Sequence, residues 1–263
     1  MSSTTKDTRL IYASPRLKAV TAQTRTPTIN QHRMASDSPQ FLVKHKSFKD
    51  IIGANPSVFL CTESNNGTSI FHEACVYMPS TSSLFVTSNI LNDASTGKKQ
   101  ILVSKVDVNT YQVEPVDAGL VMGNGGVNYK DGILFCDQGD LSHPSALVHV
   151  RPTPDGIYTT QIVVEDFDGV PFNSLNDVVI AKDGAIWFTD PPYGHEQVFR
   201  GHPQLPAMVY RFDPVSGQVR AMADGFGRPN GLAFSPDEKV LFVTDTDHIH
   251  GDGTIDPRRP STM

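Results

Sequence analysis

The sequence has few of the features that mark secreted, zinc-binding or nucleic-acid-binding proteins. Its three cysteines, Cys61, Cys75 and Cys136, are an odd number, lie far apart and form no Cys-x-x-Cys pair, so neither a disulfide framework nor a zinc site is expected. No run of basic residues interleaved with aromatics occurs, and the formal net charge is -6. Nucleic acid is therefore excluded as the expected partner.

Long apolar segments are lacking as well. Within residues 1–45 the longest apolar stretch covers only residues 10–13, too short for the core of a signal peptide, and no segment has the length of a membrane span. We therefore predict a cytoplasmic protein with no membrane partner. Because its start is rich in Ser, Thr, Gln and Lys, we expect a flexible N-terminal arm over residues 1–39, followed by one folded domain over 40–263.

A long internal repeat is the strongest positive feature of the sequence. Four segments share one pattern, an apolar and β-rich run that ends in a small polar or acidic residue: 83–88, 132–137, 185–190 and 240–245. Their ends recur at an interval of about 50 residues, which matches one blade of a β-propeller in the standard repeat families. We expect these segments to be the inner strands of successive blades.

Within each period the pattern is strand, turn, strand. Residues 177–182 lead into Asp183-Gly184, a common hairpin turn, and then into the apolar run 185–189. Stretches with helical periodicity are almost absent, which excludes α/β architectures. The predicted fold class is all-β, a β-propeller whose blades are four-stranded antiparallel sheets, with a β-sandwich of accidental periodicity as the main alternative.

The number of blades follows from the number of periods. Three periods are full, beginning near Phe71, Leu120 and Phe172, whereas the fourth contains only the runs 231–234 and 240–244. We expect a partial propeller of about three and a half to four blades. Uncovered blade faces would favour self-association.

Oxygen-bearing side chains recur at one position of the repeat. Glu73, Asn176 and Asn230 precede the ends of their segments by almost the same interval, and Asn124 is the nearest counterpart in the second period. Because the rotation of a propeller gathers equivalent positions around one axis, we expect these side chains to converge. A carboxylate and two amides suit calcium or another hard divalent ion. The alternative is that the asparagines only form turns at strand entries.

Three stretches of the chain resemble the SMP-30/gluconolactonase family, most closely its fungal lactonohydrolase branch. They are residues 71–79, 174–194, which includes Thr-Asp-Pro-Pro-Tyr-Gly, and 228–245, which includes Arg-Pro-Asn-Gly, and the resemblance spans roughly residues 70–260. It implies a six-bladed propeller with an axial divalent ion, most often calcium. By motif, Glu73, Asn176 and Asn230 match three of its metal ligands.

The resemblance also implies the chemistry. The family hydrolyses aldonolactones and similar lactones, so the chain is expected to be a metal-dependent hydrolase that opens the ring of a small-molecule lactone, or a related ester or anhydride, in a fungal secondary-metabolite pathway. Tyr193 and His195, directly after the third segment, are expected to touch the substrate.

One element of the family's machinery is not assigned to any residue here. The family's general base, an Asp in a Pro-Asp-Gly motif that is also a metal ligand, lies about one repeat period after the position of Asn230, and this sequence ends at Met263, before that distance is reached. The resemblance thus leaves the catalytic base of the 263-residue form unassigned. Two other functions stay open: a non-catalytic propeller acting as a binding module, and an enzyme of the strictosidine-synthase or phosphotriesterase kind.

Overall fold

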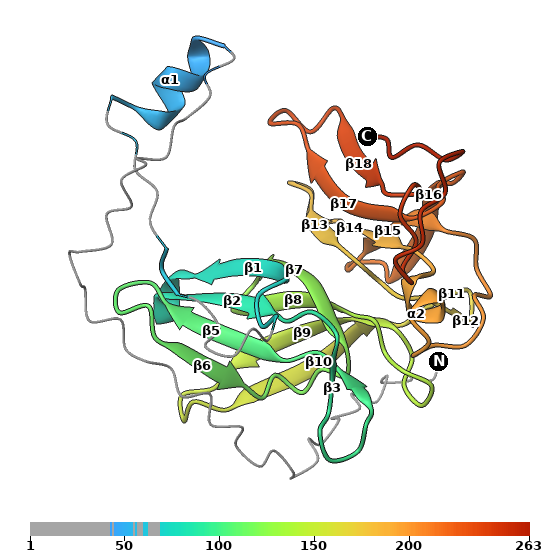
Figure 1. Cartoon of the computed structure of the whole chain (residues 1–263), viewed down its shortest axis with the longest axis horizontal. Coiled ribbons are helices and arrows are strands. Elements are labelled where there is room, and N and C mark those ends of the chain that lie inside the picture. Colours follow the sequence, from blue (N-terminus) through green and yellow to red (C-terminus); the bar gives the residue numbers. More distant parts are fainter. Residues whose placement is uncertain (1–42, 44, 55, 57–59, 63–68) are drawn as a thin grey trace, which may run out of the picture.

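The computed structural model describes residues 43, 45–54, 56, 60–62 and 69–263, so the predicted arm over 1–39 lies outside the described residues. Strands dominate, which confirms the all-β class. The helical elements are α1 (Ser47–Ile52), the single 3-10 turn η1 (Pro79–Thr81) and α2 (Tyr193–Glu196). Helix α1 has no buried residue and lies apart from the sheets (Figure 1). Among the described residues, no helix has the length and apolar character needed to cross a membrane.

Three four-stranded antiparallel sheets and one two-stranded sheet follow one another along the chain, each with its strands in sequence order. Their strands are β1 (Glu73–Met78), β2 (Ser83–Thr87), β5 (Val103–Asp107) and β6 (Val113–Val116); β7 (Gly123–Tyr129), β8 (Gly132–Asp137), β9 (Ala146–Pro152) and β10 (Tyr158–Val164); β13 (Val178–Ile180), β14 (Ile186–Asp190), β15 (Met208–Asp213) and β16 (Gln218–Ala223); and β17 (Pro229–Phe234) with β18 (Leu241–Asp245). The connections carry two small hairpins, β3 (Leu91–Asn92) with β4 (Lys99–Gln100) and β11 (Asp166–Phe167) with β12 (Val170–Pro171). The predicted strand, turn, strand pattern is confirmed.

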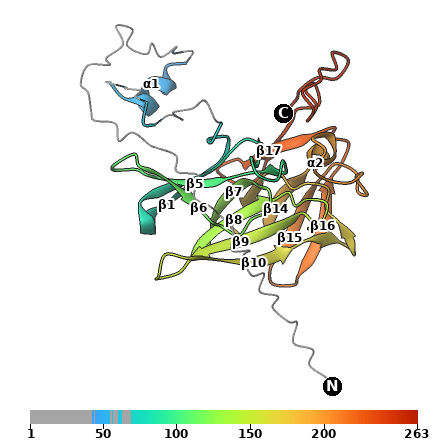
Figure 2. The ribbon, with the colours of Figure 1, turned by 60° about the horizontal axis from the view of Figure 1, so that its bottom comes forward.

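The sheets pack one behind the next, as the fan of strands in Figure 2 shows. Their shared edge is formed by the first strand of each sheet, because β1 packs against β7, β7 against β13, and β13 against β17. The repeated segments form the second strands instead, β2, β8, β14 and β18. The prediction that they are the innermost strands was therefore wrong. An apolar run marks the strand that is most deeply covered, and that strand lies one place away from the shared edge.

Strand β8 shows why the repeat is apolar throughout. All six of its residues are buried, and alternate side chains point to opposite faces. Ile133 and Phe135 join the core between the first and second sheets. Leu134 and Cys136 join the core between the second and third sheets. A strand covered on both faces reads as a continuous apolar run, as seen in the sequence.

An aspartate at the end of the second strand is a repeated anchor. In three sheets its carboxylate accepts two backbone N–H groups of the segment that leads into the first strand: Asp137 from Val121 and Met122 at 2.7 and 2.8 Å, Asp190 from Asn173 and Ser174 at 2.9 and 2.8 Å, and Asp245 from Gly227 and Arg228 at 3.0 and 2.7 Å. Burial raises the pKa of Asp190 to about 7, although these two N–H groups and Arg200 act in the opposite direction. The terminal Asp of the repeat therefore has a structural role.

Candidate functional site

A cavity of about 170 Å³ lies at the edge where the first strands of the sheets meet. It is lined by residues of all four sheets and their connections: His72, Glu73, Asn89, Ile90, Ile101, Asn124, Gln138, Asn176, Tyr193, Gln197 and Asn230. The structure thus brings together Glu73, Asn176 and Asn230, the three side chains singled out by their place in the repeat. It adds Asn124 and Tyr193 to the same wall.

Irregular strand pairing sets the direction of three of these side chains, Glu73, Asn124 and Asn230. The register shifts between Glu73 and Val76 in β1, between Gly123 and Gly126 in β7, and between Pro229 and Leu232 in β17. Bulges of this kind bend a strand and redirect its side chains, and they are frequent beside active sites. The lining residue of each of these strands lies at or inside its irregular stretch. Asn176 differs, because it lies just before β13.

The bulge in β1 holds two non-glycine residues in the left-handed region. Ala74 has a φ of 66° and Cys75 a φ of 52°. Alanine and cysteine rarely adopt this conformation, and such strain persists only where the surrounding structure enforces it, often at functional sites. The strained pair follows Glu73 directly, so this irregular backbone sets where its carboxylate lies.

Each sheet is tied to the next at a cavity asparagine. Thr87 Oγ1 donates to the carbonyl oxygen of Asn124 at 3.1 Å, and Thr189 Oγ1 donates to that of Asn230 at 2.7 Å. Between the second and third sheets the backbone N–H of Gly125 donates to the carbonyl of Asn176 at 2.9 Å. In all three hydrogen bonds the acceptor is the backbone carbonyl of a cavity-lining asparagine. These bonds therefore stabilise the position of its side chain.

Two carboxylates, those of Glu73 and Asp177, supply negative charge near the edge that the sheets share. Burial raises the pKa of Glu73, His72 beside it acts to lower that pKa, and Asp177 raises it further. The pKa of Asp177 is itself raised by burial. Asp177 was not singled out by sequence reasoning, although its place directly after Asn176 was a usable signal. Its carboxylate accepts the N–H of Leu232 at 3.1 Å and so joins β13 to β17.

The amides of the cavity are suited to a cation. Asn124 and Asn176 are each only 7% exposed, and among the described residues no hydrogen bond is made by either side-chain amide. Both amides line the cavity, so they are available there to water or an ion. With one carboxylate among the lining residues, the donors are oxygens, which a hard divalent ion prefers. Among the described residues, no cluster of three or more His, Cys, Asp or Glu could hold a metal ion, so amide oxygens are essential to any metal site in this cavity.

Tyr193 reaches the cavity from helix α2. Its hydroxyl accepts a hydrogen bond from Asn230 Nδ2 at 3.1 Å and is also hydrogen-bonded to Thr246 Oγ1. The tyrosine therefore contacts a predicted ligand directly. Its predicted role in touching substrate stays a prediction.

His195 lies elsewhere. It lines a second cavity, of about 390 Å³, together with Asp140, His143, Arg200 and His202. Its ring is tilted against that of His202, with the ring centroids 4.8 Å apart. The structure thus places Tyr193 and His195, both on α2, in different cavities, and a substrate role of His195 stays a prediction.

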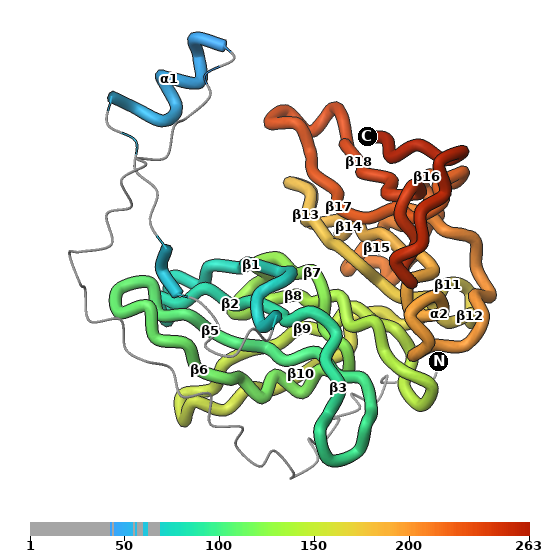
Figure 3. Tube along the Cα trace, viewed as in Figure 1, coloured from blue at the N-terminus to red at the C-terminus, as the bar shows by residue number. Residues whose placement is uncertain are grey.

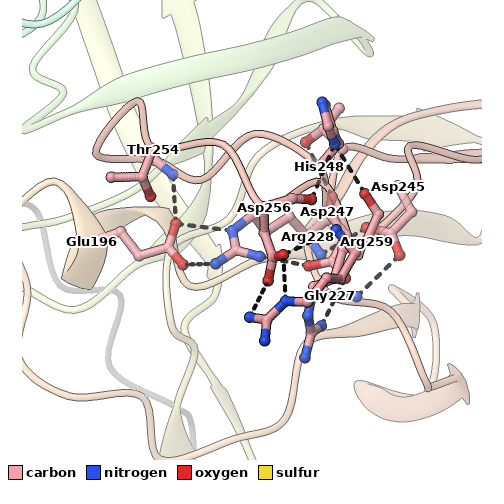
Figure 4. Close-up of polar contacts among 12 residues, drawn as sticks. Glu196, Gly227, Arg228, Asp245, Asp247, His248, Thr254, Asp256 and Arg259 are labelled. Atoms are coloured by element: carbon pink, nitrogen blue, oxygen red, sulfur yellow. Dashed lines mark hydrogen bonds and ion pairs between the residues drawn. The ribbon is translucent and has the colours of Figure 1, made fainter.

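A charged cluster surrounds Arg228, which lies two residues before Asn230 in the chain (Figure 4). Arg228 forms a bidentate pair with Glu196 through Nη2 to Oε1 at 2.5 Å and Nε to Oε2 at 3.1 Å. Its Nη1 donates to Asp247 at 2.5 Å, and Asp247 also accepts from Arg259 at 2.7 Å. The segment after β18 runs back to α2 (Figure 3), where the N–H of Gly251 donates to Glu196 at 2.6 Å. The cluster joins α2, the start of β17 and this segment.

Comparison with known proteins identifies relatives of the chain. The model of the SMP-30/gluconolactonase/LRE-like region matches residues 71–250. Lactonohydrolase oryL of Aspergillus oryzae is 32% identical over 237 residues, which are 82% of this chain and 49% of that protein. A gluconolactonase of Zymomonas mobilis is 35% identical over 147 residues, or 51% of this chain and 37% of that protein.

A solved structure of a gluconolactonase from Xanthomonas campestris resembles the fold. It superposes with a TM-score of 0.55 at 28% sequence identity, over 72% of this chain and 57% of that one. The chain spans about half the length of the curated lactonohydrolase and less of the curated gluconolactonase.

Proposed function

Because the chain belongs to the SMP-30/gluconolactonase/LRE-like family, we propose that it acts as a metal-dependent hydrolase that opens the ring of a small-molecule lactone. The names of its relatives, lactonohydrolase and gluconolactonase, support this reaction. The single observation that carries the proposal is the cavity in which Glu73, Asn176 and Asn230 meet.

The proposed architecture is a six-bladed propeller of the gluconolactonase type. In it, the four-stranded sheets are consecutive blades and the cavity that holds Glu73 lies on the axis. Two observations support this: the sheets pack in chain order through their first strands, and the candidate ligands lie in the first strands β1 and β17 or just before the first strand β13. Equivalent positions of successive blades are expected to face one channel.

In this proposal Glu73, Asn176 and Asn230 would hold a divalent ion, with calcium favoured because every donor is an oxygen. When bound, such an ion supplies a positive charge that polarises a carbonyl oxygen and lowers the pKa of water. The buried amide of Asn176, which has no partner among the described residues, fits that role.

The chain's own side chains would position the lactone. Asn124 and Gln138 are placed to hydrogen-bond a small polar molecule within the cavity, and Tyr193 closes the wall beside Asn230. Glu73 is the one carboxylate among the described lining residues and is used as a ligand, so we assign no lining residue as general base. We also propose that the lactone comes from a fungal secondary-metabolite pathway; the fungal source of the related lactonohydrolase, Aspergillus oryzae, is consistent with this.

The test is hydrolysis of glucono-1,5-lactone by the 263-residue chain, monitored by proton release in a weakly buffered solution. We expect EDTA to abolish turnover and added calcium to restore it. The substitutions Asn176→Ala and Asn230→Ala should each abolish turnover as well. Asn128→Ala is the matched control, because Asn128 lies exposed on the same strand as Asn124.

Turnover that survives EDTA and both substitutions would contradict a metal-dependent hydrolase. Calcium-dependent binding of the lactone without turnover would instead indicate a binding module. Both results leave the fold and the family unchanged, so the experiment separates the activity from the scaffold.

A further inference from the structure

We infer that the hydroxyl of Tyr193 is a positioning group that fixes the side-chain amide of Asn230, so that Oδ1 rather than Nδ2 is left for the cavity. The consequence for an ion rests on the function proposed above. The orientation itself rests on hydrogen bonds within the chain. Tyr193 is thereby a positioning residue, in addition to any contact it makes with substrate.

The direction of the hydrogen bonds follows from the last acceptor in the chain of contacts. Thr246 Oγ1 lies 3.5 Å from the carbonyl oxygen of Arg228, which can only accept and which also accepts the backbone N–H of Thr246 at 3.1 Å. We assign the threonine hydrogen to this carbonyl. Thr246 Oγ1 then accepts from the Tyr193 hydroxyl, with which it is in close contact. The tyrosine oxygen in turn accepts from Asn230 Nδ2 at 3.1 Å.

This relay assigns the two ends of the amide. An asparagine presents a donor and an acceptor of nearly the same shape, and only its partners decide which faces where. The Tyr193 oxygen occupies the donor end of Asn230. Among the described residues, no corresponding partner contacts the side-chain amides of Asn124 and Asn176. Of the three asparagines at equivalent repeat positions, Asn124, Asn176 and Asn230, Asn230 is therefore the one whose amide the described part of the chain orients before any ion binds.

An ion pair between Arg228 and Glu196 holds the helix that carries Tyr193 in place. Tyr193 begins α2, and Glu196 at the end of this short helix is paired with Arg228, which lies just before Asn230 in the chain. The side chains of Arg228 and Glu196 are 10% and 15% exposed, so the bidentate pair is largely shielded from solvent. The same pair, visible in Figure 4, fixes the distance between the elements that carry Tyr193 and Asn230.

Groups that orient a ligand from outside the coordination sphere typically contribute about 10- to 100-fold to metal affinity. Tyr193→Phe removes the hydroxyl and keeps the ring. We expect it to weaken calcium binding about tenfold. Tyr210→Phe is the matched control, because the Tyr210 hydroxyl is buried with no hydrogen-bond partner among the described residues and belongs to the core between the second and third sheets.

The first measurement needs no metal. The side-chain amide protons of Asn230, assigned in the NMR spectrum by comparison with Asn230→Asp, are followed for exchange with solvent in calcium-free protein. We expect exchange at least several-fold faster in Tyr193→Phe than in the wild type, and unchanged in Tyr210→Phe. Thr246→Val, which removes the acceptor of the tyrosine hydrogen, should give an intermediate rate. Calcium titration by calorimetry of the same four proteins, wild type included, is the second measurement.

Faster exchange together with weaker calcium binding in Tyr193→Phe, with Tyr210→Phe unchanged in both, supports the inference. Equal exchange in the wild type and Tyr193→Phe overturns it, whatever the calorimetry gives. If exchange changes as expected but wild-type protein binds no calcium, the orientation stands and the metal-dependent function proposed above fails. Unchanged calcium affinity in Tyr193→Phe overturns the claim that the orientation serves an ion.

Discussion

Two cavities in the described part of the molecule differ in how their polar groups are used. In the larger, Arg200 donates to the carbonyl oxygens of Asn173, Asp140, His143 and Phe172. The amide of Asn173 is likewise paired with the backbone of Leu205. In the smaller cavity the amides of Asn124 and Asn176 have no partner among the described residues, although both are almost fully buried.

Volume therefore does not identify the site. A larger hollow whose donors and acceptors are already paired needs no ligand to be stable, whereas amides that face a cavity without a protein partner are available to a ligand. We expect the smaller cavity, which holds Glu73, to bind a ligand and the larger cavity, which holds Arg200, to act as a structural junction between loops. The predictions below test this contrast.

The largest effect is expected at Glu73. Glu73→Gln keeps the size of the side chain and removes the one carboxylate among the described lining residues. Because even outer-shell groups contribute about 10- to 100-fold, loss of a charged ligand should weaken calcium binding by more than about 100-fold and reduce lactone turnover accordingly. Calorimetry and turnover measure this. His202→Ala, in the larger cavity, should change neither; a loss there comparable to that of Glu73→Gln would reverse the assignment of the two cavities.

The next effect concerns stability. Arg200→Leu removes four hydrogen bonds from a cationic group to backbone carbonyls in the wall of the larger cavity. Leaving those carbonyls without donors should lower the free energy of unfolding by about 3 kcal/mol, as measured by urea denaturation. Arg220→Leu on the exposed strand β16 is the control and should change it by less than about 0.5 kcal/mol. A destabilisation by Arg200→Leu no larger than this would show that the junction is dispensable.

A smaller effect should appear as pH dependence. The pKa of Asp190 is raised by burial from 3.8 to about 7 in the folded chain. The folded state then binds more protons than the unfolded state between these values, so stability is greatest at low pH and is lost as the pH rises towards 7. Between about pH 5.5 and 8 this group should remove on the order of 2 kcal/mol.

Denaturation of Asp190→Asn at both pH values isolates this contribution, because all other titrations are shared with the wild type. The variant should lose less stability than the wild type over this pH range. Identical losses in the two proteins would show that Asp190 does not titrate there. Asp190 anchors the segment that leads into the third sheet, so the test reports on the scaffold shared by both cavities.

The smallest effect is expected at the tie between the third and fourth sheets. Thr189→Val keeps the shape of the side chain but removes the donor to the carbonyl oxygen of Asn230. The substitution also removes the acceptor for the backbone N–H of Asp177 at 3.1 Å. Loss of these two hydrogen bonds should cost about 1 to 2 kcal/mol of stability and a few-fold in calcium affinity. Thr110→Val, at an exposed turn, is the control. Calcium affinity unchanged by Thr189→Val would show that this tie serves the fold alone.

Much of the fold was predictable because its signals are local. The apolar run of β8 and the Asp-Gly turn before β14 depend only on neighbouring residues, and both are confirmed. The position of a strand within its sheet, by contrast, does not depend on neighbouring residues alone. The run looks innermost because it is buried on both faces, yet the polar and bulged strand before it forms the shared edge.

The site residues were predictable where they recur at a fixed spacing in the repeat. Equal spacing placed Glu73, Asn176 and Asn230 together, and the structure brings them into one cavity. The repeat spacing could not show that α2 directs Tyr193 and His195 towards different cavities. This short helix has no counterpart in the other periods among the described residues. The repeat spacing also could not reveal Arg228 and Glu196, whose pairing depends on the path of the segment after β18.

The threonine and glycine ties have a consequence for how this centre can change. The backbone carbonyl of each cavity asparagine accepts a hydrogen bond from the preceding sheet, so exchanging a single sheet for a homologous one would disturb two neighbours at once. Altered specificity is thus more accessible through the connecting loops than through the strands. Engineering of this scaffold should treat the braced strands as one inseparable unit.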